Sequence, residues 1–213
     1  MSLNSGGLGK NNKTETLESF LLEQNIDIAL IQETKLKKSI YLRSYKSINK
    51  KAYGSDSSKG GLSIIFKPYL KFFISEKLIS NEDFMGINLF DLHIINCYGR
   101  HYDTKTKINY QKKFQEKLKK LSQQLKNQKL LIAGDFNLDN QQLNKLEFLE
   151  KSNLEILKNE TSSRKRNIDH FISHSILFQN STNSIVQTPK IFQDETNLSD
   201  YKKIIKKKKN KNK

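Results

Sequence analysis

Short apolar runs that end at an acidic or amide side chain constrain the fold of this chain most strongly. Residues 26–31 run into Glu33, and residues 129–133 run into Asp135 and Asn137. Apolar runs of this length, bounded by polar residues, are typical of buried strands. Because a sheet can bring together residues that follow strands distant in sequence, the pattern predicts an α/β domain with polar side chains gathered at its strand ends.

Two helical patterns and several further strands complete the predicted domain. Leu17, Phe20 and Leu21 recur at helical spacing within residues 14–25, and a long amphipathic helix is predicted over residues 106–126. Further strands are expected at 61–66, 71–78, 84–90, 92–98, 168–172 and 184–188, with a short helix near 141–150. No repeat or linker divides the chain, so we expect one domain over residues 1–203 and a disordered, lysine-rich tail over residues 204–213.

The charge of the chain indicates a polyanionic partner. The formal net charge is +16 at pH 7, and residues 201–213 supply eight lysines and no acid, so half of the surplus lies elsewhere in the chain. A surplus of this size favours nucleic acid over an anionic membrane surface. An AT-rich genome, which overuses lysine and asparagine codons, would produce the same composition, and the sequence leaves both explanations open.

Cysteine content and hydropathy exclude several protein classes. The single cysteine, Cys97, excludes an internal disulfide framework and a thiolate zinc cluster, which favours a reducing, intracellular compartment. No apolar run approaches the roughly 18 residues that a membrane span requires, so no membrane partner is expected. With 35% hydrophobic residues, including 12 Phe and 8 Tyr, the chain can bury a packed core.

Five motifs stand in an order that resembles the endonuclease/exonuclease/phosphatase superfamily. They are Ser2-Leu3-Asn4-Ser5-Gly6-Gly7-Leu8, Ile31-Gln32-Glu33-Thr34, Gly134-Asp135-Phe136-Asn137, Ile168-Asp169-His170 and Leu198-Ser199-Asp200. The resemblance covers essentially the whole chain, and its first two motifs are most similar to the apurinic-type endonuclease domains of non-LTR, LINE-like retrotransposons. It implies a four-layer α/β sandwich, with two mainly antiparallel sheets packed face to face and helices outside.

The same resemblance implies a metal-dependent hydrolase of phosphodiesters. Glu33 is expected to hold Mg²⁺ or Mn²⁺, with Asn4 beside it at the metal centre. The implied catalytic residues are Tyr98 and Asn137 at the phosphate, Asp135 at the attacking water, Asp169 as the partner of a catalytic histidine, and Asp200 beside metal and phosphate. Oxygen ligands are those that hard divalent cations prefer, so the residue types suit this chemistry.

A basic cluster precedes Asp169. Arg164, Lys165 and Arg166 are candidates for contacts with the phosphates of a nucleic acid backbone. A solvated basic loop would have the same composition, and the sequence does not decide between the two.

The pattern departs from the family at Tyr201. Ser199-Asp200-Tyr201 stands where the resemblance predicts Ser-Asp-His. A phenol with a pKa near 10 can donate one neutral hydrogen bond but cannot supply a cation near neutral pH. Loss of one charged donor to the transition state commonly lowers a rate by about 10²–10³. His170 and His174 are expected to project from a strand and its following turn, so the sequence predicts impaired activity.

Three functions are compatible with the sequence. The first is a metal-dependent endonuclease that nicks DNA, and the second is an inactive descendant that binds nucleic acid or serves as a scaffold. The third is a phosphatase of a small phosphorylated molecule, which the basic surplus disfavours. The retained acids favour the first function, and Tyr201 favours the second. The sequence leaves open a place in a larger polyprotein or assembly, and the lysine tail could be a nuclear signal or a nucleic-acid arm.

Overall fold

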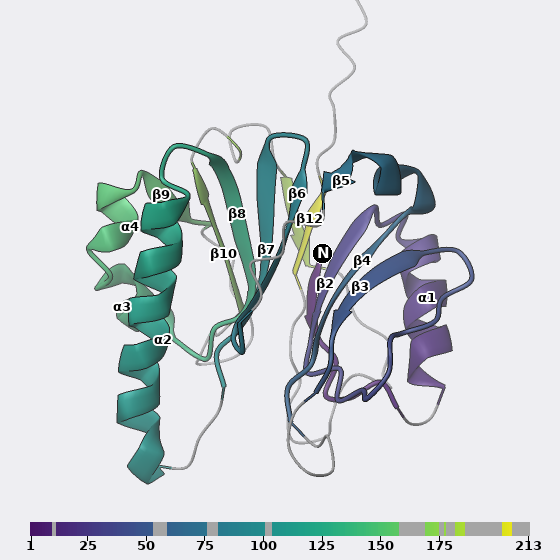
Figure 1. The fold of residues 1–213 in the computed structure, drawn as a ribbon, viewed down its shortest axis with the longest axis horizontal. Coiled ribbons are helices and arrows are strands. Elements are labelled where there is room, and N and C mark those ends of the chain that lie inside the picture. Colours follow the sequence, from purple (N-terminus) through teal and green to yellow (C-terminus); the bar gives the residue numbers. More distant parts are fainter. Residues whose placement is uncertain are drawn as a thin grey trace, which may run out of the picture.

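The computed structural model places two sheets face to face, with helices on both outer flanks (Figure 1). It describes residues 1–9, 12–52, 59–75, 81–100, 104–157 and 169–174, residue 177, and a two-stranded sheet of β11 (Thr182–Ile185) and β12 (Lys202–Ile205). The predicted four-layer sandwich of mainly antiparallel sheets is confirmed. Of the tail predicted over residues 204–213, residues 204–205 belong to β12, and residues 206–213 lie outside the described residues.

The smaller sheet has the strand order β1-β2-β4-β3. Its strands are β1 (Ser2–Asn4), β2 (Ile28–Gln32), β3 (Lys46–Lys50) and β4 (Leu62–Phe66), and helix α1 (Lys13–Glu23) covers its outer face. The strands β1 and β2 pair in parallel, while β4 pairs antiparallel with β2 and with β3. Because side chains alternate along a strand, Ile31 packs with Leu17 of α1, and Leu30 packs against the other sheet.

The larger sheet has the strand order β5-β6-β7-β8-β10-β9. Its strands are β5 (Ile74–Ser75), β6 (Phe84–Leu89), β7 (Leu92–Tyr98), β8 (Lys129–Asp135), β9 (Leu154–Ile156) and β10 (Asp169–His174). Helices α2 (Thr104–Gln124), α3 (Asn140–Asn144) and α4 (Phe148–Lys151) lie on its outer side (Figure 1). Strands β7 and β8 are parallel because α2 carries the chain back between them, and both therefore end at the same edge.

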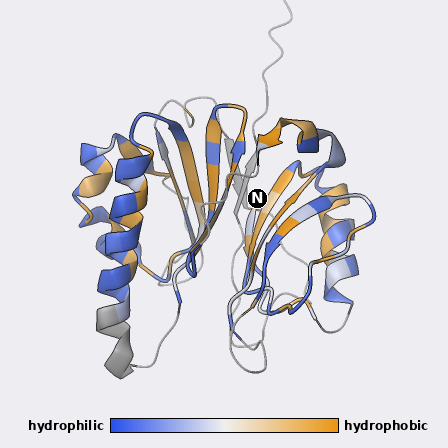
Figure 2. Ribbon diagram, in the orientation of Figure 1, coloured by the Kyte–Doolittle hydropathy of each residue, from blue (hydrophilic) through white to orange (hydrophobic). Residues whose placement is uncertain are grey.

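Three apolar cores fill the spaces between the four layers. Phe114 and Leu118 of α2 pack with Ile132 of the larger sheet, and Ile64 and Ile94 pack between the two sheets. Figure 2 shows the hydrophobic residues on the strands and the hydrophilic residues on the outer faces of the helices. Burial of apolar surface is the main favourable contribution to folding, so these cores fix the layers. In the described part of the chain no helix is long and apolar enough to cross a membrane.

Two predicted elements are wrong. The strand predicted over residues 71–78 begins as a 3₁₀ helix, η1 (Pro68–Phe73), and only Ile74–Ser75 of it is described as a strand. Pro68 at the first turn favours this helix, because its ring fixes φ near the helical value. The single helix predicted near residues 141–150 is two short helices, α3 and α4, separated by a turn at residues 145–147.

Candidate active site

Four of the expected site residues come to one rim of the sandwich. Asn4 ends β1, Tyr98 ends β7, Asp135 ends β8, and Glu33 directly follows β2. The ends of β7 and β8 lie at the lower edge of the larger sheet in Figure 1. Tyr98 is the Cα partner of Asp135 in the larger sheet, and Asn4 is the partner of Gln32 in the smaller one, so strand register brings each pair to the end of its own sheet. The packing of the two sheets then brings the pairs together.

Side-chain hydrogen bonds join these residues across the two sheets. The Asn4 amide Nδ2 donates to Glu33 Oε1 at 3.1 Å and to Asp135 Oδ2 at 2.8 Å. The Tyr98 hydroxyl donates to the same Glu33 Oε1 at 2.5 Å. Asn4 and Glu33 belong to the smaller sheet, whereas Tyr98 and Asp135 belong to the larger one. The rim therefore gathers two carboxylates, an amide and a phenol in direct contact.

The surroundings of Glu33 keep its carboxylate ionised. Burial raises its pKa, but the hydrogen bonds from Tyr98 and Asn4 and the charge of Lys35 lower it, and the net pKa lies below the usual value. The Lys35 ammonium Nζ lies 3.1 Å from Glu33 Oε2. A carboxylate that is ionised and aimed at its neighbours is the form that binds cations.

Asp135 and Asn137 are held by a tight crossing of two chain segments. Asp135 is 4% exposed, and its Oδ1 accepts the Asn137 backbone N–H at 3.0 Å. The Asn137 side-chain amide donates to the carbonyl oxygen of Gly99. A Cβ at Gly99 would lie 2.0 Å from the Phe136 carbonyl oxygen, so only glycine permits this approach. The crossing fixes Asn137 next to Tyr98.

A buried pair of amides joins β2 of the smaller sheet to β7 of the larger one. Gln32 Nε2 donates to Asn96 Oδ1 at 2.7 Å, and both side chains are fully buried. Asn96 Nδ2 donates in turn to the backbone carbonyls of Ile31, at 3.0 Å, and Ser63, at 2.9 Å. Gln32 precedes Glu33, and Asn96 lies two residues before Tyr98. These bonds, which we call the amide clamp, therefore set the position of Glu33 against Tyr98.

A charged cluster lies beside Tyr98 around Asp83, the residue that directly precedes β6. Asp83 is fully buried, and its carboxylate accepts the Tyr110 hydroxyl at 2.6 Å and pairs with Lys117 at 2.6 Å and with Arg100 Nε at 3.3 Å. Burial and the hydrogen bond to Asp83 raise the pKa of Tyr110, so the phenol stays protonated. The Asp83 carbonyl accepts the Tyr98 backbone N–H at 2.9 Å, which connects the cluster to the site.

Comparison with known proteins identifies the family. Residues 1–189 match the endonuclease/exonuclease/phosphatase family. The chain belongs to this family. No curated protein sequence matches the chain.

Two solved structures show which members of the family the fold is similar to. One is an AP endonuclease from Archaeoglobus fulgidus, 13% identical, with a TM-score of 0.64 over 89% of this chain and 92% of that chain. The other is the endonuclease domain of TRAS1, a telomere-specific non-LTR retrotransposon, 13% identical, with a TM-score of 0.55 over 85% and 87%. At this identity the likeness shows a shared fold.

The remaining expected site residues are placed in part or not at all. The backbone of Asp169 begins β10, and its Cα partner is Asp135, so it lies at the same rim. Asp200, Tyr201 and the basic cluster Arg164, Lys165 and Arg166 lie outside the described residues. His170 is fully buried, with Nε2 2.7 Å from the Leu138 carbonyl oxygen, and its ring packs edge-on against Phe136. This histidine therefore belongs to the core.

The described side chains suit a hard divalent cation. Glu33 and Asp135 offer carboxylate oxygens, the ligand type that Mg²⁺ and Mn²⁺ accept. Asn4 turns its Nδ2 toward both carboxylates, while its Oδ1 accepts the Gly6 backbone N–H at 3.0 Å. Across the described ranges, no three His, Cys, Asp or Glu side chains form a metal-binding group. Mg²⁺ is commonly held by one or two carboxylates with water completing its shell, so the donor set fits that ion.

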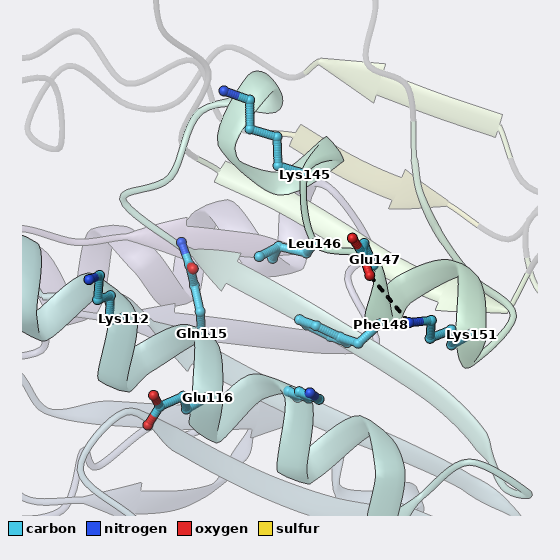
Figure 3. Close-up of a pocket in the computed structure, with 9 residues that line it drawn as sticks. Lys112, Gln115, Glu116, Lys145, Leu146, Glu147, Phe148 and Lys151 are labelled. Atoms are coloured by element: carbon cyan, nitrogen blue, oxygen red, sulfur yellow. Dashed lines mark hydrogen bonds and ion pairs between the residues drawn. The ribbon is translucent and has the colours of Figure 1, made fainter.

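A shallow pocket lies elsewhere, on the outer helical layer. It has a volume of about 310 Å³ between α2 and the α3–α4 pair, and its lining contains none of the site residues (Figure 3). Leu146 and Phe148 provide its apolar part, and four lysines surround them with Glu116 and Glu147. The rim site and this pocket are separate features.

Sequence reasoning missed several residues that shape the site. Lys35 and Asp83 were not singled out, although Lys35 follows Glu33 by two residues. A basic residue that close to a candidate metal ligand is a usable local signal. Asp83 has no such signal, because its partners Arg100 and Lys117 are distant in sequence.

Proposed function

We propose that this protein is a divalent-metal-dependent endonuclease that nicks DNA, with activity reduced by Tyr201. The observation that carries the proposal is the contact of Glu33, Asn4, Tyr98 and Asp135 at one rim of a nuclease-family sandwich. The reaction is hydrolysis of a phosphodiester bond by water.

The chemistry assigns a task to each side chain. Asp135 orients and deprotonates the attacking water, because it is a buried carboxylate fixed by Asn4 and by the Asn137 backbone. Tyr98 and Asn137 donate hydrogen bonds to the phosphate. Glu33 would hold the divalent ion, with Asn4 beside it, and the ion would supply positive charge for the developing oxyanion.

Charge and fold likeness support DNA as the substrate. The net charge of +16 favours a polyanion over a small phosphorylated molecule. The two similar structures are an AP endonuclease and a retrotransposon endonuclease domain. A polymeric substrate explains a basic surplus of which half lies outside residues 201–213 better than a phosphomonoester does.

Tyr201 favours a second candidate, a DNA-binding descendant without catalysis. Loss of one charged donor to the phosphate leaves binding through lysine and arginine contacts largely intact. Activity measurements separate the two candidates, because both predict DNA binding and only the first predicts nicking.

Nicking of supercoiled plasmid DNA tests the proposal. Wild-type protein with Mg²⁺ or Mn²⁺ is expected to convert the plasmid slowly to the open circle, and Glu33→Ala is expected to abolish the conversion, because the ion loses its principal ligand. Glu23→Ala, which removes an exposed glutamate at the end of α1, is the matched control and should retain activity. Nicking that persists in Glu33→Ala contradicts the assigned centre, and a wild type without any nicking favours the binding module.

The dependence of DNA binding on salt tests the charge argument. Affinity for a duplex is expected to fall steeply as salt rises, because each neutralised phosphate releases counterions. Deletion of residues 206–213, which removes six lysines, should weaken binding and flatten this dependence while the domain stays folded. Fluorescence anisotropy across a salt series measures both effects. Equal affinity at low and high salt would contradict binding through phosphates.

A further inference from the structure

The turn that follows β2 has a strained backbone held by several bonds. Glu33 and Lys35 both have φ values of 50°, in the left-handed region that residues with side chains rarely adopt. Backbone bonds hold them there, with Thr34 N donating to the Gly61 carbonyl at 3.1 Å and Lys35 N to the Gly60 carbonyl at 3.0 Å. Backbone strain that the surrounding structure maintains in this way is concentrated at functional sites. The strained turn therefore marks Glu33 and Lys35 as candidate functional residues.

Glycine is required where this turn meets the neighbouring loop. Gly61 has a φ of +86°, and a Cβ there would lie 2.3 Å from the Thr34 hydroxyl oxygen. Ser5 adds a hydrogen bond from its hydroxyl to the Glu33 carbonyl at 3.1 Å. The turn is therefore built to present both the Glu33 carboxylate and the Lys35 ammonium at the rim.

The two oxygens of Glu33 have different partners. Oε1 accepts two hydrogen bonds, from Tyr98 and from Asn4, which engage both of its lone pairs. Oε2 contacts the Lys35 ammonium at 3.1 Å. A cation that binds this carboxylate must therefore approach Oε2, the oxygen that Lys35 occupies.

The Lys35 ammonium is placed so that it can move away from Glu33 Oε2. Its side chain is 36% exposed, and its other close contact, with the Gly6 carbonyl at 3.4 Å, is a long hydrogen bond. A lysine on a flexible stem can move its charge into solvent, whereas the short bond to Oε1 comes from the largely buried Tyr98.

We propose that Lys35 is an internal counter-cation that exchanges with the divalent ion at Glu33 Oε2. It neutralises the carboxylate when no ion is bound, and it lowers the affinity of the site for the ion because binding must first displace it. This inference rests on one part of the proposed function, namely that the cofactor is a divalent ion. It assigns Lys35 a positioning and regulatory role in addition to the direct contacts described above.

Metal affinity is the first test. Isothermal titration of Mn²⁺ into wild type, Lys35→Gln and Lys37→Gln, without DNA, compares removal of the contacting charge with removal of an exposed charge two residues away. Lys35→Gln is expected to bind Mn²⁺ at least about threefold more tightly than wild type, since a like charge at contact distance is removed. Lys37→Gln should stay within about twofold, because its charge is screened by solvent. Affinity that is unchanged or weaker in Lys35→Gln, or binding absent from both, overturns the exchange.

A double-mutant cycle in EDTA is the second test, and it needs no metal. Lys35→Gln should lower the urea midpoint of the wild type but not that of Glu33→Gln, because the ammonium then has no carboxylate to neutralise. An equal shift in both backgrounds overturns the counter-cation role. Neither test uses nicking, so a protein that fails to cleave DNA can still support the exchange. The converse result is a wild type that nicks DNA while its affinity for Mn²⁺ equals that of Lys35→Gln. That result overturns the exchange at Lys35 and leaves the proposed nuclease function intact.

Discussion

Tyr201→His is expected to raise the rate of metal-dependent DNA nicking at least about tenfold, because it restores a cation at the phosphate. A protonated histidine stabilises charge that develops on the phosphate, and removing one such donor commonly costs about 10²–10³ in rate. Its expected partner is Asp169, whose backbone lies opposite Asp135 at the rim. Conversion of supercoiled plasmid under single-turnover conditions measures the gain.

Two further variants show whether the gain comes from the assigned centre. Adding Glu33→Ala to Tyr201→His should remove it, because the histidine cannot act without the ion and the positioned water. Tyr201→Phe should not produce a gain, since it adds no charge. Strong nicking by the wild type that Tyr201→His leaves unchanged would show that Tyr201 is compatible with full activity. An inactive Tyr201→His would place the defect elsewhere in the site.

Asp83→Asn is expected to lower the free energy of unfolding by about 3 kcal/mol. The Asp83 carboxylate is fully buried, and Arg100, one of its cationic partners, is only 9% exposed. Removing the charge of one member of a buried ion pair commonly costs about 3–5 kcal/mol, because the other member keeps its desolvation cost. The Glu82 carboxylate, 3.0 Å from Arg100 Nη2, offsets part of the loss. Urea unfolding followed by circular dichroism measures the change.

Asp91→Asn is the matched control for this variant. Asp91 pairs with Lys129, and both side chains are largely exposed, so the pair is screened by water. Loss of such a surface pair typically costs less than about 1 kcal/mol. If Asp83→Asn costs no more than Asp91→Asn, the Asp83 cluster does not stabilise the fold.

The apolar strands and the long helix were predictable because their pattern is local. Residues 92–98 form β7 as predicted, and β2 and β8 lie within two residues of their predicted bounds. Strand β3, with the sequence KSINK, was missed because an edge strand that is partly exposed needs no apolar alternation. Strand β9 was missed for a similar reason, since it also lies at a sheet edge and has only three residues.

The candidate site residues that could be predicted are those that follow a predicted strand or match a family motif. Glu33 and Asp135 were singled out because each follows an apolar run, and the structure brings them to one amide, Asn4. Partnerships between distant segments carry no local signal. The pairing of Asp83 with Lys117 depends on how α2 packs, so it follows from tertiary structure alone. The contact of Lys35 with Glu33 Oε2 joins neighbours in sequence, but its geometry depends on the left-handed backbone at residues 33 and 35.

The amide clamp limits which residues of this domain can be substituted without moving β7 relative to the opposite sheet. Apolar packing between two sheets has no preferred direction, so exchanges among aliphatic side chains of similar volume are tolerated. The hydrogen bond that Asn96 accepts from Gln32 and the two that it donates to the Ile31 and Ser63 carbonyls are directional, and they tie β7 to two strands of the opposite sheet. The alignment of Glu33 with Tyr98 therefore depends on a few polar atoms, while the surrounding core can exchange aliphatic residues of similar volume. A chain built in this way can keep its fold when nearly nine residues in ten differ, as they do between it and the Archaeoglobus fulgidus AP endonuclease, which is 13% identical.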